Sequence, residues 1–155
     1  GTTHIQALDL FFRKIAKDGG ATLTGLLDQM EKLCQSDVGG AALDEDKKAL
    51  ARAVGDVKGI FGAMMGKVGE SLYHVGLQGN RILIGLAELV IGWLWVRQAV
   101  AALRGKAERP EDGQLYDGKL AACRWCRNVL PGLTLTRKLI ESSSLELMEL
   151  GDDAF

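Results

Sequence analysis

The spacing of apolar residues along the chain is that of α-helices. Apolar side chains recur at positions 5, 8, 11, 12 and 15, and again at 23, 26, 27, 30 and 33. This spacing places each set on one side of a helix. Two glycines, Gly19 and Gly20, separate the sets, and a glycine-containing stretch over 36–42 follows the second. The pattern predicts helices over residues 5–16 and 22–34, and no alternating pattern predicts a strand.

A longer helix is predicted from residue 44, where acidic side chains begin a segment with a heptad seam. Its apolar positions are Leu50, Val54, Val57, Phe61, Met64 and Val68. The glycines beside this seam are Gly55, Gly59, Gly62, Gly66 and Gly69. Each glycine costs about 1 kcal/mol relative to alanine inside a helix. We therefore predict that a neighbouring helix packs unusually close along them; the alternative is a flexible switch segment.

The next predicted helix, over 81–103, is apolar nearly all round and is capped by Asn80. Residues 70–79 either extend the preceding helix or break it. A helix of this kind is the centre of a bundle or a membrane span. Glu88 interrupts the apolar run, and Arg97 follows it, so we favour a buried central helix.

The last third of the chain predicts a helix over 114–130 that Pro131 ends or kinks, and another over 133–140. Ser143 or Ser144 is expected to cap a last turn over 145–150, and the terminal Phe155 could dock in a pocket. The predicted fold class is all-α: a four- to five-helix antiparallel bundle with a close-packed glycine-rich helix interface.

Composition narrows the function classes. The chain has 19 basic and 20 acidic residues and no basic patch, which argues against nucleic acid as a partner. Three cysteines favour a reducing compartment over a disulfide framework. The chain begins without a methionine or a leader, so we expect an excised or processed segment of a cytoplasmic protein.

Two candidate chemical motifs are weak. Cys123 and Cys126 form a CxxC, but it lies inside a predicted helix with no strand before it, so two core or boundary residues are expected rather than a redox site. Glu70 and His74 are four residues apart, and a surface hydrogen bond is their expected role. Two histidines are too few for a di-metal bundle, and no metal site is predicted.

The opening residues GTTHIQALDLFFRKI carry a family resemblance. They are similar to the end of the catalytic domain of acyl-CoA dehydrogenases, in which Glu-Gly-Thr is followed by two variable residues and Ile-Gln. Gly1, Thr2, Ile5 and Gln6 match that wording. Further along, the chain resembles the extra C-terminal helical domain of a bacterial subset of the family. The matching residues there are Tyr116, Gly118, Lys119, Leu130 and Pro131, together with the apolar stretch 79–103.

The resemblance implies where chemistry would lie. In the family, the glutamate before Gly1 is the base that removes the α-proton of an acyl-CoA, and Gly1 lies beside that base and the thioester. Thr2 and His4 take the positions that contact the adenosine part of FAD, with Thr3 between them; the family more often has Gln in place of His4. We expect residues 1–18 to end the catalytic domain and residues 19–155 to form a C-terminal bundle domain.

The resemblance also implies partners for the parent enzyme: an acyl-CoA substrate, electron-transfer flavoprotein and a homo-oligomeric assembly, with no nucleic acid and no membrane span. This fragment is expected to be inactive and free of flavin. Its role would be packing or oligomerisation, with Trp93, Trp95 and Trp125 as candidate anchors. Two alternatives are a stand-alone helical-bundle interaction module and a membrane-associated protein that inserts residues 82–103.

Overall fold

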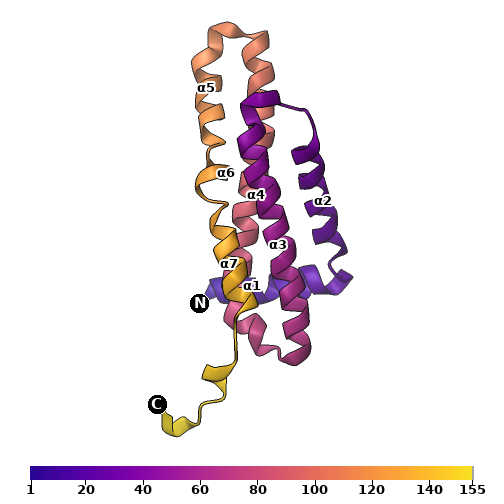
Figure 1. Cartoon of the computed structure of the whole chain (residues 1–155), viewed down its shortest axis with the longest axis vertical. Coiled ribbons are helices and arrows are strands. Elements are labelled where there is room, and N and C mark those ends of the chain that lie inside the picture. The colour runs from indigo at the N-terminus through magenta and orange to yellow at the C-terminus, as the bar shows by residue number, and fades with distance from the viewer. Residues whose placement is uncertain (155) are drawn as a thin grey trace.

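The computed structural model describes residues 1–154 and is all-α (Figure 1). No strand occurs in that range, and the predicted all-α antiparallel bundle is confirmed. Short 3₁₀ turns connect some of the helices, and Phe155, whose docking the sequence suggested, lies outside the described residues. The helices are α1 Thr2–Asp9, α2 Ala21–Gln35, α3 Asp44–Glu70, α4 Tyr73–Glu108, α5 Gly113–Ala122, α6 Trp125–Asn128 and α7 Gly132–Glu141.

The long helices α3 and α4 form the centre of the bundle (Figure 1). α2 runs beside α3, α5 packs on α4, and α6 and α7 contact α3. The predicted seam of α3 faces the core, since Leu50, Val54, Val57 and Met64 are fully buried. α4 contributes a matching row of buried side chains, Val75, Ile82, Leu89 and Val96.

The first segment runs across the lower part of this bundle, above the turn that joins α3 to α4 (Figure 1). α1 passes directly into a π-helical turn over Leu10–Ile15, and Phe11 and Ile15 from that turn join the main core. The Phe11 ring stacks on Phe61 of α3, with 6.4 Å between ring centroids. Gly19 and Gly20 then take positive φ angles and turn the chain into α2.

Several predicted helix ends are wrong. α4 begins at Tyr73, and the break from α3 is at Ser71, whose backbone is extended. Asn80 therefore lies inside α4 and caps nothing. The helix predicted over 114–130 is two helices separated by a turn at Cys123 and Arg124.

The end of the chain also differs from the prediction. Pro131 lacks an N–H, which ends the second of those helices, and it precedes the first residue of α7. Within the last turn predicted over 145–150, a single 3₁₀ turn covers Glu146–Met148. Leu145 is its N-cap residue and no side chain caps it, so the predicted serine cap is wrong.

The predicted close packing along the α3 glycines is wrong. A Cβ built at Gly55, Gly62, Gly66 or Gly69 would meet nothing within 4 Å, and only Gly59 has a neighbour, the Arg137 side chain. The glycines and the seam residues follow the same alternating spacing of three and four along the sequence. The sequence pattern therefore could not show that the glycines face away from the core. They form an exposed strip on the outside of α3.

The close helix contacts come instead from glycines of α4. A Cβ at Gly85 would lie 2.9 Å from Leu133 Cδ2, and one at Gly92 would lie 2.8 Å from Leu130 Cδ1. Both leucines are fully buried. A Cβ at Gly105 would likewise overlap the ring of Tyr116 of α5. α4 thus packs closely against α5 and against the segment that leads into α7, because it has glycines, which lack side chains, where these segments cross it.

The sequence suggested that α4 is buried on all sides, but the structure leaves part of its surface exposed. Ile84, Ile91 and Leu94 are exposed, because the neighbouring helices cover only part of its surface. By length and composition α4 is the one described helix long and apolar enough to cross a membrane, and 33% of its most apolar window is buried.

Buried polar contacts fix the last helices to α3. Asp56 is buried on α3 and accepts a hydrogen bond of 2.6 Å from the Thr134 hydroxyl of α7. Asp46, also buried, accepts one of 2.8 Å from Arg127 Nε of α6. A hydrogen bond to a buried carboxylate contributes about 1.5–3 kcal/mol. These contacts set the register of α6 and α7 along α3.

The two sets of glycines predict opposite effects of alanine. We expect Gly62→Ala on α3 to raise the free energy of unfolding by about 0.5–1 kcal/mol, because the position is helical and open. Gly92→Ala should lower it by about 1–3 kcal/mol, because the new methyl group overlaps buried Leu130. Urea unfolding followed by circular dichroism measures both, and a loss of stability in Gly62→Ala would contradict the open strip.

Candidate functional site

The residues that the resemblance associates with flavin and substrate lie together at the free end of α1. Gly1, Thr2 and Thr3 are exposed and His4 is half-buried. The threonine hydroxyls can donate and accept hydrogen bonds, and the neutral His4 ring donates through one nitrogen and accepts through the other, as contacts to a phosphate, ribose or adenine edge require. The chemistry of these groups therefore fits contact with the adenosine part of a dinucleotide such as FAD.

The bundle holds α1 in place through the end of the helix opposite to Thr2. Ala7 is buried where α1 crosses α4, and a Cβ at Gly79 would lie 3.3 Å from the Ala7 methyl carbon. Further along the same segment Phe11 is buried in the core. Asp9 and Arg13 form an exposed ion pair of 2.7 Å across one turn. The side chains of Thr2 and Thr3 thus project from a helix that is fixed at its other end.

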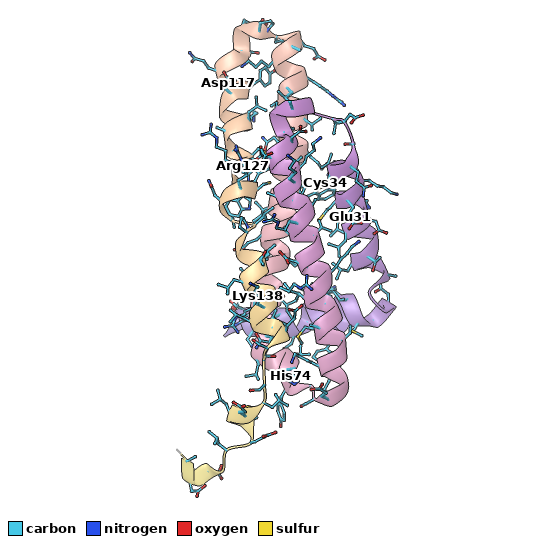
Figure 2. The ribbon with its side chains drawn as sticks, viewed as in Figure 1. Glu31, Cys34, His74, Asp117, Arg127 and Lys138 are labelled. Carbon is cyan, nitrogen blue, oxygen red and sulfur yellow. The ribbon has the colours of Figure 1, made fainter. Side chains whose placement is uncertain are left out.

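Glu70 and His74 do not share a helix face, and the predicted surface hydrogen bond is wrong. Glu70 ends α3, His74 lies in the first turn of α4, and the chain break at Ser71 separates them. His74 is buried, with its Nε2 atom 3.7 Å from Glu70 Oε2 (Figure 2). Its Nδ1 atom has no hydrogen-bond partner among the described residues. In the same range no group of three or more His, Cys, Asp or Glu side chains is placed to hold a metal ion.

The cysteines of the CxxC lie at the break between α5 and α6 rather than inside one helix. Both Cys123 and Cys126 are fully buried, as the core interpretation required. The Cys126 thiol lies within reach of both the Gly92 carbonyl oxygen, 3.4 Å away, and the Cys123 sulfur. The Cys126 thiol donates a hydrogen bond to the Cys123 sulfur, and this bond lowers the pKa of Cys123. The same hydrogen bond raises the pKa of Cys126, and burial raises it further.

The third cysteine, Cys34, is half-buried where α2 packs on the core (Figure 2). Burial raises the pKa of its thiol to about 11, against a smaller lowering by Lys47. Lys47 itself is buried, and its ammonium group donates to the backbone carbonyl oxygens of Ser36 at 2.8 Å and Val38 at 3.2 Å. These two hydrogen bonds close the loop between α2 and α3, a role of Lys47 that no sequence pattern indicated.

An apolar hollow lies between the first segment, α2 and α3. Its volume is about 390 Å³, and its walls include Ile15, Leu23, Leu27, Phe61 and Met65. Lys58 at the rim already contacts Glu31 at 2.8 Å and Asp28 at 3.7 Å. The hollow can hold an apolar group; the polar side chains of its lining are Thr24 and Lys58, and Lys58 is already paired with carboxylates.

Comparisons with known proteins agree with the N-terminal and C-terminal resemblances. The profile of the family described as "Acetyl-CoA dehydrogenase C-terminal like" matches residues 26–151. The chain is also similar to the broad-specificity linear acyl-CoA dehydrogenase FadE5 of Mycobacterium tuberculosis. The two are 41% identical over 165 aligned residues, which cover 100% of this chain. The chain spans 27% of the length of that curated relative.

The raised pKa of the half-buried Cys34 predicts a loss of stability at alkaline pH. Its folded pKa is raised from 9.0 to about 11, so the unfolded thiol loses its proton first as pH rises. The folded state then binds more protons than the unfolded state, and stability falls between pH 9 and 11. We expect urea unfolding at these pH values, under reducing conditions, to show a smaller decline in Cys34→Ala than in the original chain. Equal declines would contradict the assignment.

Proposed function

The chain belongs to the acyl-CoA dehydrogenase family as its C-terminal helical domain, and on this premise we propose that it completes an FAD-dependent enzyme that oxidises acyl-CoA to 2,3-enoyl-CoA. The observation that carries the proposal is the 41% identity to an acyl-CoA dehydrogenase over 100% of the chain. The family depends on FAD in general. Flavin, when bound, accepts the hydride from the β-carbon of the substrate.

The chain's own contribution is to hold side chains at the edge of that reaction. A glutamate directly before Gly1 removes the α-proton, and Gly1 leaves space for the thioester beside it. Thr2, Thr3 and His4 bind the adenosine part of the cofactor through their hydroxyl groups and ring nitrogens. The exposure of Thr2 and Thr3 at the end of a fixed helix supports this placement.

The bundle contributes rigidity. Residues 1–18 end the catalytic domain and residues 19–155 form the C-terminal domain, with the boundary in the positive-φ pair Gly19 and Gly20. The family match that begins at residue 26 supports this boundary. Phe11 and Ile15 join the core of the second part, so the bundle stabilises the helix that carries the cofactor contacts. The enzyme is cytoplasmic and passes its electrons to electron-transfer flavoprotein.

Threonine substitutions test the cofactor contact in the chain joined to its upstream coding sequence. We expect Thr2→Ala to weaken FAD retention by roughly tenfold, since it removes one hydrogen bond to the cofactor. Flavin absorbance of the dialysed enzyme measures retention. Thr24→Ala, at an exposed threonine on α2, is the matched control and should retain flavin normally.

The upstream residue provides the second arm of this test. A glutamate should precede Gly1, and its change to glutamine should abolish acyl-CoA oxidation while flavin stays bound. An upstream sequence that starts near Gly1, or an unaltered rate in the glutamine variant, would contradict the proposal and favour a stand-alone interaction module.

A further inference from the structure

The two cysteines of the CxxC stand at the two ends of the turn that separates α5 from α6. The backbone N–H of Cys126 donates a hydrogen bond of 3.0 Å to the carbonyl oxygen of Cys123. The ψ angles of Cys123 and Arg124 are −17° and −14°, which is nearer to a 3₁₀ turn than to an α-helix. We propose that Cys123 and Cys126 are an oxidative modification site, at which a small peroxide converts the two thiols to a disulfide across this turn.

The turn brings the two cysteines to the separation that a disulfide needs. The first and last residues of a four-residue turn have Cα atoms less than about 7 Å apart. Disulfides join residues whose Cα atoms are about 4.4–6.8 Å apart. Side chains three residues apart eclipse each other in a 3₁₀ turn, and the Cys126 thiol already donates a hydrogen bond to the Cys123 sulfur. The backbone therefore already has a conformation in which the two sulfur atoms can bond.

The surroundings of the two thiols assign them different roles. The hydrogen bond from Cys126 is the largest influence on Cys123 and lowers its pKa, against smaller increases from burial and from Asp46. The same hydrogen bond and burial raise the pKa of Cys126. The thiolate is the form of cysteine that reacts with oxidants. Cys123 is therefore the cysteine that reacts first, and Cys126 is the one that closes the disulfide.

A polar hollow beside the turn gives a small oxidant a route to the pair. Its volume is about 330 Å³. The lining residues that flank the cysteines in sequence are Leu120, Ala121, Arg124 and Arg127. Asp46 lines the same hollow, and its charge acts on both thiols, so the hollow lies close to them.

Burial restricts which oxidants can react. Cys123 and Cys126 are both 0% exposed, so the sulfur atoms become accessible only when the structure opens locally. α6 has only four residues, and such short elements open at a lower free energy than the core helices. Hydrogen peroxide is hardly larger than water and can enter a small opening, whereas glutathione disulfide or a protein disulfide is too bulky. The site is thus distinct from a thioredoxin-like motif, which exchanges disulfides with other proteins.

The proposed reaction has two steps. The Cys123 thiolate attacks one oxygen of hydrogen peroxide: an S–O bond forms, the O–O bond breaks, and the hydroxide that leaves takes up the proton released by Cys123. The Cys126 sulfur then attacks the Cys123 sulfur: an S–S bond forms, the S–O bond breaks, and the second hydroxide leaves as water with the Cys126 proton. The two thiols lose two electrons and two protons in all, and one peroxide is reduced to two waters.

Peptide mapping of the purified 155-residue chain tests the proposal. Trypsin cleaves after Lys119, Arg124 and Arg127, so it places Cys123 and Cys126 in different peptides. The folded chain is treated with peroxide, alkylated in denaturant and digested. We expect peptides 120–124 and 125–127 to be recovered joined by a disulfide, and dithiothreitol before alkylation to separate them.

Cys34 is the internal control in the same digest. Burial raises the pKa of its thiol to about 11, so it should remain reduced and be alkylated in full. It is also a competing partner, because its charge contributes to the raised pKa of Cys126. A disulfide that joins Cys34 to Cys126 would overturn the proposal. So would three alkylated thiols in the folded chain at a peroxide dose that oxidises the chain unfolded in urea.

Serine variants separate the two roles. In Cys126→Ser the sulfenic acid on Cys123 has no second thiol to react with, so dimedone, which labels sulfenic acids, should label Cys123. In Cys123→Ser the labelling of Cys126 should be slower by about tenfold or more, because its thiol keeps its proton. Circular dichroism checks that both variants are folded. Equal labelling rates in the two folded variants would contradict the assigned order.

Glutathione disulfide gives the arm that tests the size limit. It should leave the folded chain with three free thiols at a concentration equal to that of the peroxide. A glutathione adduct on Cys123 would contradict a site open only to small oxidants. All of these outcomes are independent of the proposed enzyme activity, because the experiments need neither flavin nor the upstream sequence.

Discussion

Burial of the first segment against the bundle joins residues 1–18 to the helices that follow. Phe11 stacks on Phe61 and is 2% exposed, and Ile15 is buried beside it. Full burial of such a side chain stabilises the folded state by about 1.5–3 kcal/mol. Within α1, Ala7 packs against α4 at Gly79, which has no side chain to hold the helices apart. The helix that carries Thr2–His4 is thereby anchored to the bundle.

Close packing at glycines of α4 also organises the rest of the bundle. α4 lacks side chains at Gly85, Gly92 and Gly105, where other segments cross it, so buried leucines and a tyrosine ring fill those positions. Carboxylates on α3 then fix the position of α6 and α7 through hydrogen bonds. The apolar core and these few buried polar contacts together stabilise the fold.

The sequence predicted the elements that depend on local pattern. The helical spacing and the heptad seam of α3 were sufficient for the all-α class and for core residues such as Leu50 and Met64. The family resemblance was readable because its motifs occur in a fixed order, and the comparisons confirm it. The placement of Thr2, Thr3 and His4 in a cofactor site stays a prediction.

What the sequence missed depends on contacts between distant segments. Glycines of α3 and α4 have similar spacing, and only the tertiary packing decides that Gly92 meets a side chain and Gly62 meets solvent. α4 was predicted to be buried because its composition is apolar, but composition does not reveal how many neighbours a helix has. His74 is buried in the first turn of α4, just after the break at Ser71; Gly69 near that break is only one of several α3 glycines, so it did not mark the helix end.

The central claim is that the first segment is an integral part of the bundle and is held there by Phe11 and Ile15. Hydrogen exchange of the purified chain tests it most directly. Amides of residues 10–15 should exchange as slowly as the core amides of α4, because both would open only with global unfolding. Exchange of residues 10–15 at the rate of a frayed terminus, while α4 stays protected, would contradict the claim.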